Sequence, residues 1–254
     1  MSLKALIFDV DGTLADTERN GHRVAYNKAF AEMGINWDWS EKTYGEILTV
    51  SGGKERMKYF VDNYQPDIPA DRDLEQLIAE IYVTKTRIFK EMLLTGLIPL
   101  RSGVARLFKE AREAGIRLAI ATTTAPSNVQ YLLSSTLGEE SLDWFDIIAA
   151  GDIVENKKPS AEIYQLVLDE MGWTAGECVA FEDSENGCLS ARGADLPVII
   201  TVTAYTRDEP FIGASLVLDQ LGDPDDPAEL LDDPQGAFKG PVLDVDYLIK
   251  NYGQ

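Results

Sequence analysis

Two aspartates, Asp9 and Asp11, follow a short apolar run at residues 4–8 and are followed by Gly12. Side chains two residues apart in a strand face the same way, so the two carboxylates begin on one side of the backbone and repel unless a cation lies between them. An exposed acidic turn would also explain a bare Asp-x-Asp pair. The full stretch Phe8–Leu14 is much rarer by chance, and it predicts a site at the carboxyl end of a first, buried strand.

Further polar residues follow the later apolar runs of the chain. Thr122 and Thr123 come after the run 116–121, Lys158 lies in the loop 151–159, and Glu182 and Asp183 come after the run 177–181. Taken singly, Thr122 could be a helix cap and Lys158 a solvated loop lysine. Because the carboxyl ends of parallel strands share one edge of a sheet, we expect these residues to converge on Asp9 and Asp11.

This set of side chains predicts a metal and a phosphoryl group. Carboxylates gathered in a cleft require a cation, and Mg²⁺, which uses one or two carboxylates plus water and phosphate, fits better than Ca²⁺, which needs more ligands. Zn²⁺ prefers histidine and cysteine, and the chain has a single histidine. The Thr122 hydroxyl and the Lys158 ammonium supply the donors that a phosphoryl group needs.

The elements that must position these residues alternate between strand and helix. Strands are expected at 4–8, 116–121, 145–149, 177–181 and 198–201, with an edge strand at 215–219, and helices at 103–114, from about 127, through 163–167, at 189–192 and at 245–251. Such alternation predicts an α/β fold, a doubly wound, Rossmann-like parallel sheet covered by helices. The Asp- and Pro-rich segment 222–240 is expected to be a surface loop.

A helical insert interrupts this alternation after the first strand. A helix capped by Asp16 or Thr17 is expected to end at Gly34, a second helix spans residues 74–89, and no strand is predicted in between. The predicted organisation is therefore a discontinuous core of residues 1–16 and 96–254 and a helical domain of residues 17–95. Trp37 and Trp39 are expected to pack between helices, and the loop 49–56, which contains Gly52-Gly53-Lys54, is either a helix cap or a ligand loop.

Composition narrows the choice of partners and location. The chain of 254 residues has a formal charge of −20, and a pI near 4.3 argues against binding to nucleic acid or to an anionic membrane. No apolar run approaches the roughly 20 residues that span a bilayer. With a first strand starting at about residue 4, we expect no signal or transit peptide and a cytoplasmic protein, in which Cys178 and Cys188 are packed, reduced thiols.

The ordered motifs at the strand ends resemble those of the haloacid dehalogenase superfamily, and the core is similar to its phosphohydrolases. Within that superfamily the chain resembles the CbbY proteins, which are phosphatases for xylulose 1,5-bisphosphate, a by-product of Rubisco. The features that carry this resemblance are Phe8–Leu14, Glu18 with Gly21-His22-Arg23, Gly52–Met57, Pro99-Leu100-Arg101, Lys157-Lys158-Pro159 and Glu182-Asp183-Ser184. The resemblance implies that the helical insert is a cap domain and that the protein acts on a phosphorylated sugar, as a monomer.

The resemblance also implies roles for individual residues. Asp9 would be the nucleophile that forms an aspartyl phosphate, and Asp11 the acid and base that protonates the leaving oxygen and later activates water. Mg²⁺ would be held by Asp9, the backbone carbonyl of Asp11 and Asp183, with Glu182 nearby. The remaining roles are phosphoryl binding by Thr122, the Thr123 N–H and Lys158, and sugar recognition in the cap by Glu18, His22 and Lys54.

Several alternatives stay open at this stage. β-Phosphoglucomutases share the same layout, and their aspartyl phosphate is passed to another hydroxyl instead of water. Phosphonoacetaldehyde hydrolases also have a helical cap, with a Schiff-base lysine for which Lys54 is the candidate. Haloacid dehalogenases lack the second aspartate, so Asp11 argues against them, and His22 could equally be an ordinary packed residue. A catalytically inactive binding module is the alternative from another class.

Overall fold

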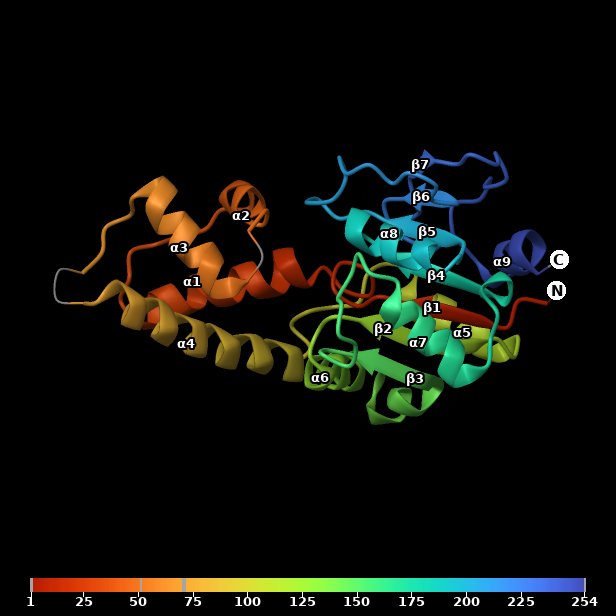
Figure 1. Cartoon of the computed structure of the whole chain (residues 1–254), viewed down its shortest axis with the longest axis horizontal. Coiled ribbons are helices and arrows are strands. Elements are labelled where there is room, and N and C mark those ends of the chain that lie inside the picture. Colours follow the sequence, from red (N-terminus) through yellow and green to blue (C-terminus); the bar gives the residue numbers. More distant parts are fainter. Residues whose placement is uncertain (1, 51, 70–71, 254) are drawn as a thin grey trace. The chain divides into compact units, whose positions relative to one another are not determined.

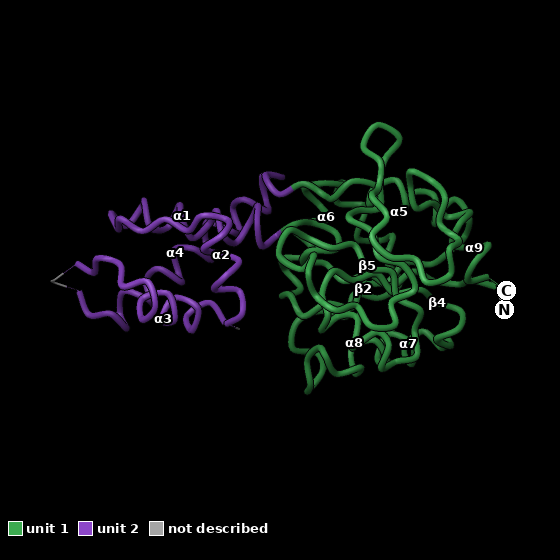
Figure 2. The backbone as a smooth tube through the Cα atoms, turned by 90° about the horizontal axis from the view of Figure 1, so that it is seen from above, with its two compact units in different colours: residues 1–16, 99–254 green, residues 17–98 purple. Residues whose placement is uncertain are grey.

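The computed structural model describes residues 2–50, 52–69 and 72–253, so Ser51, part of the predicted loop after residue 49, lies outside the description. The chain divides into two compact units (Figure 2): residues 1–16 with 99–254, and residues 17–98.

The first unit is built on a seven-stranded sheet (Figure 1). Its strands, in sequence order, are β1 (Ala5–Phe8), β2 (Arg117–Thr122), β3 (Phe145–Ala150), β4 (Cys178–Glu182), β5 (Val198–Thr201), β6 (Leu216–Leu218) and β7 (Leu230–Asp232). The spatial order is β3-β2-β1-β4-β5-β6-β7, and every pairing is parallel except that of β6 with β7. This arrangement confirms the predicted doubly wound α/β fold, with the strand order reversing direction between β1 and β4.

Helices cover both faces of this sheet. They are α5 (Val104–Glu113), α6 (Pro126–Leu137), α7 (Glu162–Met171), α8 (Glu185–Gly193) and α9 (Val245–Tyr252), with short 3₁₀ turns at Glu139–Trp144 and Ala175–Glu177. Ile7 of β1 belongs to the buried cluster formed with α7 and α8. Phe8 points to the opposite face, where its ring meets that of Phe108 on α5 at 5.0 Å. Strand alternation therefore gives β1 two buried faces, which explains its continuous apolar sequence.

The end of the chain departs from the prediction. Residues 216–218 do form a strand, but β6 is not at the edge, because β7 pairs with it in the antiparallel direction. The prediction that residues 222–240 are only a surface loop was therefore wrong, since β7 lies within them. Leu230 is 45% exposed, so this strand lacks the apolar alternation that identifies a half-buried strand in a sequence.

The second unit consists of helices joined by loops, with no strand among its described residues. It contains a π-helical turn at Glu18–His22 that leads into α1 (Arg23–Glu32), followed by α2 (Glu41–Ile47), α3 (Gly53–Tyr64) and α4 (Leu74–Leu94). Trp37 and Trp39 are both buried, which confirms their predicted packing role. Of the two predicted cap residues, Thr17 does occupy the N-cap position of the first turn, but its side chain makes no capping hydrogen bond there. Among the helices of the described chain, none has the length and apolarity needed to cross a membrane.

Candidate active site

The candidate site lies where the neighbouring strands β1 and β4 end. Phe8 pairs with Phe181 in the parallel register, and the Asp9 N–H donates to the carbonyl of Phe181 at 3.0 Å. This register places Asp9 beside Glu182 and Asp183, and one carboxylate oxygen from each of the three lies within 4.8 Å of the others. All three are buried, with Asp9 7% exposed and Glu182 1% exposed, so an exposed acidic turn does not describe this stretch.

Lys158 is the cation that compensates two of these carboxylates. Its Nζ donates to Asp9 Oδ1 at 2.6 Å, to Glu182 Oε1 at 2.6 Å and to the carbonyl of Ala121 at 2.8 Å. These three acceptors use all three ammonium protons. Burial lowers the pKa of Lys158, but the charges of Asp9 and Glu182 outweigh burial and raise it overall. Lys158 is therefore a fixed positive charge inside the site and not a solvated loop lysine.

Tyr164, which was not among the predicted site residues, completes the surroundings of Glu182. The Tyr164 hydroxyl donates to Glu182 Oε1 at 2.6 Å, and burial raises the pKa of this hydroxyl well above its usual value. Glu182 also packs against Gly187 of α8, where a Cβ atom would lie 1.8 Å from the carboxylate. A buried tyrosine needs a hydrogen-bond partner, so a tyrosine on the apolar face of a helix that follows Lys158 was an available signal.

Asp183 differs from Asp9 and Glu182 in that Lys158 does not donate a hydrogen bond to it. Among the described residues no lysine or arginine forms an ion pair with it, and its carboxylate packs against Gly12, where a Cβ atom would lie 2.1 Å away. Burial, followed by the charges of Asp9 and Glu182, raises the pKa of Asp183 well above its usual value. Three buried oxygen donors with one ammonium to balance them suit a hard divalent cation, so the donor set fits a metal site.

The other predicted core residues lie at the end of β2, directly after Ala121, whose carbonyl accepts from Lys158, and in the turn after β1. Thr122 is the last residue of β2 and is buried, and its hydroxyl accepts from the Thr124 N–H at 3.3 Å. It does not cap α6, whose N-cap is Ala125. Thr123 follows it and is exposed, and Asp11 is half-buried in the turn after β1, where it bridges to Ala15.

The three predicted sugar-binding residues all lie in the helical unit. Glu18 accepts a hydrogen bond from the Tyr44 hydroxyl at 2.5 Å and lies 3.7 Å from Arg56. His22 Nδ1 lies 2.8 Å from Lys85 Nζ, so the imidazole accepts there and carries its proton on Nε2. Burial lowers the pKa of His22 well below its usual value, which keeps the ring neutral. Lys54 is exposed and lies over the Tyr82 ring at 5.4 Å.

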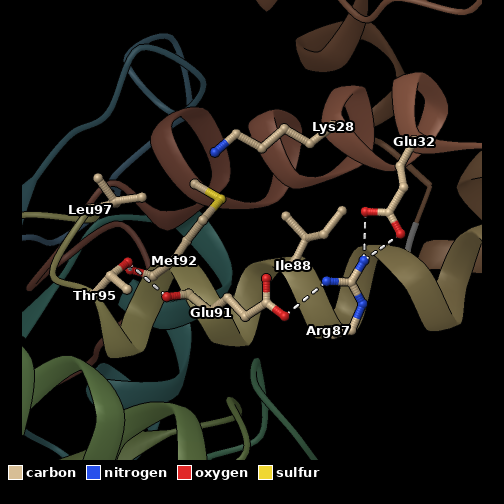
Figure 3. Close-up of a pocket in the computed structure, with 8 residues that line it drawn as sticks. All are labelled: Lys28, Glu32, Arg87, Ile88, Glu91, Met92, Thr95 and Leu97. Atoms are coloured by element: carbon tan, nitrogen blue, oxygen red, sulfur yellow. Dashed lines mark hydrogen bonds and ion pairs between the residues drawn. The ribbon is translucent and has the colours of Figure 1, made fainter.

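The helical unit also carries a surface pocket of about 340 Å³ between α1 and α4 (Figure 3). Its floor is apolar and includes Ile88 and Met92. Arg87 lies on its wall, where Glu32 and Glu91 pair with it at 2.5 and 2.8 Å. An arginine paired with two carboxylates is a poor anion ligand, so Arg87 does not make this pocket a phosphate site.

The fold and the carboxylate cluster define a hydrolase class, and comparison with known proteins identifies it. A family model described as haloacid dehalogenase-like hydrolase matches residues 3–195, and the chain belongs to this family. Its sequence is 44% identical over 225 residues to "Protein CbbY, plasmid" from Cupriavidus necator, covering 89% of this chain and 88% of that protein.

Solved structures agree with this placement. CbbY from Rhodobacter sphaeroides, crystallised as a mutant in complex with xylulose-(1,5)bisphosphate, is 45% identical with a TM-score of 0.71, covering 86% of this chain and 94% of that one. A putative β-phosphoglucomutase from Thermotoga maritima is 27% identical with a TM-score of 0.68, covering 84% and 93%. The chain is therefore similar to CbbY in both sequence and fold.

Proposed function

We propose that this protein is a Mg²⁺-dependent phosphatase that acts on a sugar bisphosphate through a phosphorylated Asp9. The observation that carries the proposal is the buried group of Asp9, Lys158 and Glu182, joined by contacts of 2.6 Å at the carboxyl ends of β1 and β4. The site lies at the point where the strand order of the sheet reverses, which is where open α/β sheets bind ligands.

In the first step, a carboxylate oxygen of Asp9 attacks phosphorus and the bond between phosphorus and the sugar oxygen breaks. Asp11 donates a proton to that departing oxygen. The product is an aspartyl phosphate on Asp9 and a free sugar hydroxyl. The ammonium of Lys158 lies 2.6 Å from Asp9 Oδ1 and holds this carboxylate in place beside the proposed phosphoryl site.

In the second step, water attacks the same phosphorus while Asp11 takes up a proton from it. The bond between phosphorus and Asp9 breaks, and inorganic phosphate leaves. The Thr122 hydroxyl, the Thr123 N–H and Lys158 are the proposed donors to the phosphoryl oxygens. Since the protein already uses all three protons of Lys158, this residue must exchange one of its present acceptors for a phosphoryl oxygen.

The proposed Mg²⁺ ligands are Asp9, the backbone carbonyl of Asp11 and Asp183, with Glu182 in support. When bound, the ion neutralises negative charge on the phosphoryl group and on the carboxylates. Asp183 forms no ion pair with any described lysine or arginine, which supports this assignment because a buried carboxylate that is not paired is costly.

Xylulose 1,5-bisphosphate is the proposed substrate, on the basis of the similarity to CbbY from R. sphaeroides. We propose that residues 17–98 act as a cap whose Glu18, His22 and Lys54 recognise the sugar and its second phosphate. The neutral His22, with its proton on Nε2, is suited to donate to a hydroxyl or phosphate oxygen, and Lys54 supplies an exposed positive charge.

The test is phosphate release from a panel of sugar monophosphates and bisphosphates with Mg²⁺, including xylulose 1,5-bisphosphate and β-glucose 1-phosphate. We expect stoichiometric phosphate from the bisphosphate, loss of this activity in chelator, and its recovery with Mg²⁺ but not with Zn²⁺. Isomerisation of β-glucose 1-phosphate without phosphate release would identify a mutase instead. Activity that is insensitive to chelation would exclude the proposed metal site.

A further inference from the structure

Arg101, which precedes α5, is bound to several parts of the sheet unit that surround the carboxylate cluster. Its guanidinium donates to the carbonyls of Gly12 and Asp219, to that of Thr201 at 2.8 Å and to that of Val202 at 2.7 Å. Its own backbone N–H donates to the carbonyl of Leu14 at 2.8 Å. One residue therefore links the turn after β1 to the segments that follow β5 and β6.

The turn that Arg101 holds contains Asp11, whose carbonyl is a proposed metal ligand, and it directly follows Asp9. The Leu14 N–H donates to the carbonyl of Val10 at 2.9 Å, and the Gly12 N–H donates to that of Ala15 at 2.8 Å, so residues 10–15 form a closed loop. Gly12 has a φ of +85°, which favours glycine at this position. The carboxylate of Asp183 packs against Gly12 so closely that no Cβ atom would fit at this position.

We infer that Arg101 is a positioning residue that fixes this loop against Asp183 and thereby sets the spacing of the oxygen donors of the metal site. Arg101 holds the Gly12 carbonyl on one side, and the Asp183 carboxylate contacts Gly12 on the other. A shift of the loop would move the Asp11 carbonyl and Asp9 relative to Asp183. This inference rests on the proposed Mg²⁺ site.

Because Arg101 is positively charged, positioning and charge repulsion predict opposite changes in Mg²⁺ affinity when it is removed. Burial lowers the pKa of Arg101, and Asp183 is the strongest of the acidic groups that act against this. If Arg101 acted on a bound cation through its charge alone, then its removal would reduce repulsion and tighten Mg²⁺ binding. If it acts by positioning, its removal should weaken Mg²⁺ binding, in the way that residues supporting metal ligands commonly do by about 10- to 100-fold.

Arg106 provides a matched control in the same unit. Its guanidinium donates to the carbonyl of Gly222 at 2.6 Å and to that of Leu243 at 3.0 Å, so it also links loops through carbonyl groups. It pairs with Glu110 at 2.9 Å and has no hydrogen bond to the turn after β1 or to Asp183 among the described residues. Removing either arginine should therefore reduce stability, because each links loops. Only removal of Arg101 should reduce Mg²⁺ affinity.

The experiment is calorimetric titration of Mg²⁺ into the full-length wild type, Arg101→Gln, Arg101→Lys and Arg106→Gln, with melting temperatures measured in chelator. We expect a Mg²⁺ dissociation constant at least tenfold higher in Arg101→Gln and within twofold of wild type in Arg106→Gln. Arg101→Lys keeps the positive charge but lacks the planar guanidinium that reaches several carbonyls at once, so it should also weaken Mg²⁺ binding. This variant provides the test if Arg101→Gln does not fold.

Unchanged or tighter Mg²⁺ binding in the Arg101 variants would overturn the inference. Equal weakening of Mg²⁺ binding in Arg106→Gln would also overturn it, because this would show that releasing any loop is sufficient to weaken Mg²⁺ binding. A wild-type protein that binds no Mg²⁺ is a separate result, since it would refute the proposed function itself and the inference with it.

Discussion

Asp9→Asn should separate activity from stability at this site. The substitution keeps the shape of the side chain but removes the charge and the nucleophilic carboxylate. We expect phosphatase activity to fall by at least ~10⁴-fold, as for the loss of other catalytic groups that act as a unit. In the absence of metal, the stability of the variant is not expected to fall.

Two effects on stability oppose each other in this variant. The attraction between Asp9 and the Lys158 ammonium at 2.6 Å is lost, which at an effective dielectric constant of about 20 costs about 6.4 kcal/mol. Repulsion from Glu182 and Asp183 is removed at the same time. The three carboxylate oxygens lie within 4.8 Å of one another, so at the same dielectric constant each fully ionised pair repels by at least about 3.5 kcal/mol. Relief of both pairs therefore offsets the lost attraction, and Lys158 keeps both of its other acceptors.

The assay combines phosphate release with melting temperatures in chelator and in Mg²⁺. In chelator, Asp9→Asn should melt at or above the temperature of the wild type. Addition of Mg²⁺ should raise the melting temperature of the wild type more than that of the variant, because the variant has lost a ligand. Asp152→Asn is the matched control, since it breaks a lysine pair of the same 2.6 Å length at a carboxylate that is 87% exposed, and it should leave activity and stability nearly unchanged.

Two results would refute this reasoning. Full activity in Asp9→Asn would remove Asp9 from the nucleophile role. A fall of several degrees in the melting temperature in chelator would show that Asp9 stabilises the metal-free fold, so that repulsion within the cluster is weaker than its geometry indicates.

Two further predictions concern Tyr164 and His22. Tyr164→Phe removes a hydrogen bond to a buried carboxylate and should lower the free energy of unfolding by roughly 1.5–3 kcal/mol, which is a fall of roughly 3–12 °C in melting temperature for a chain of this size. The control is Tyr26→Phe, because the Tyr26 hydroxyl donates to the neutral carbonyl of Gly53 at 3.2 Å. An equal fall in Tyr26→Phe would contradict the role given to the charge of Glu182. His22 is the only histidine of the sequence, and burial lowers its pKa in the folded protein well below the ordinary 6.5. Below about pH 6.5 the unfolded state therefore binds more protons than the folded state. The free energy of unfolding should fall in this range as the pH falls. Urea unfolding at pH 7 and pH 5 should show a smaller loss for His22→Asn than for the wild type, and equal losses would exclude His22 as the group responsible.

Much of the fold was predictable from local sequence. The apolar runs that became β1, β2, β4 and β5 are short, continuous and followed by polar residues, which identifies buried parallel strands. The helical unit was predictable in the same way, because α4 carries apolar residues at helical spacing over 21 residues. β7 was missed because three half-exposed residues carry no periodic pattern, and its pairing depends on β6 being present beside it.

The sequence by itself determined which residues carry the chemistry and that they follow strands, because the period of a strand and the residues that end it are local properties. The tertiary structure decided how these residues are paired. Lys158 joins Asp9 from 149 positions away and Tyr164 joins Glu182 from 18, while Arg101 reaches carbonyls on three segments of the sheet unit. Strand order and register bring such groups into contact, and no local pattern of residues encodes a distance between segments that meet only when the sheet has formed.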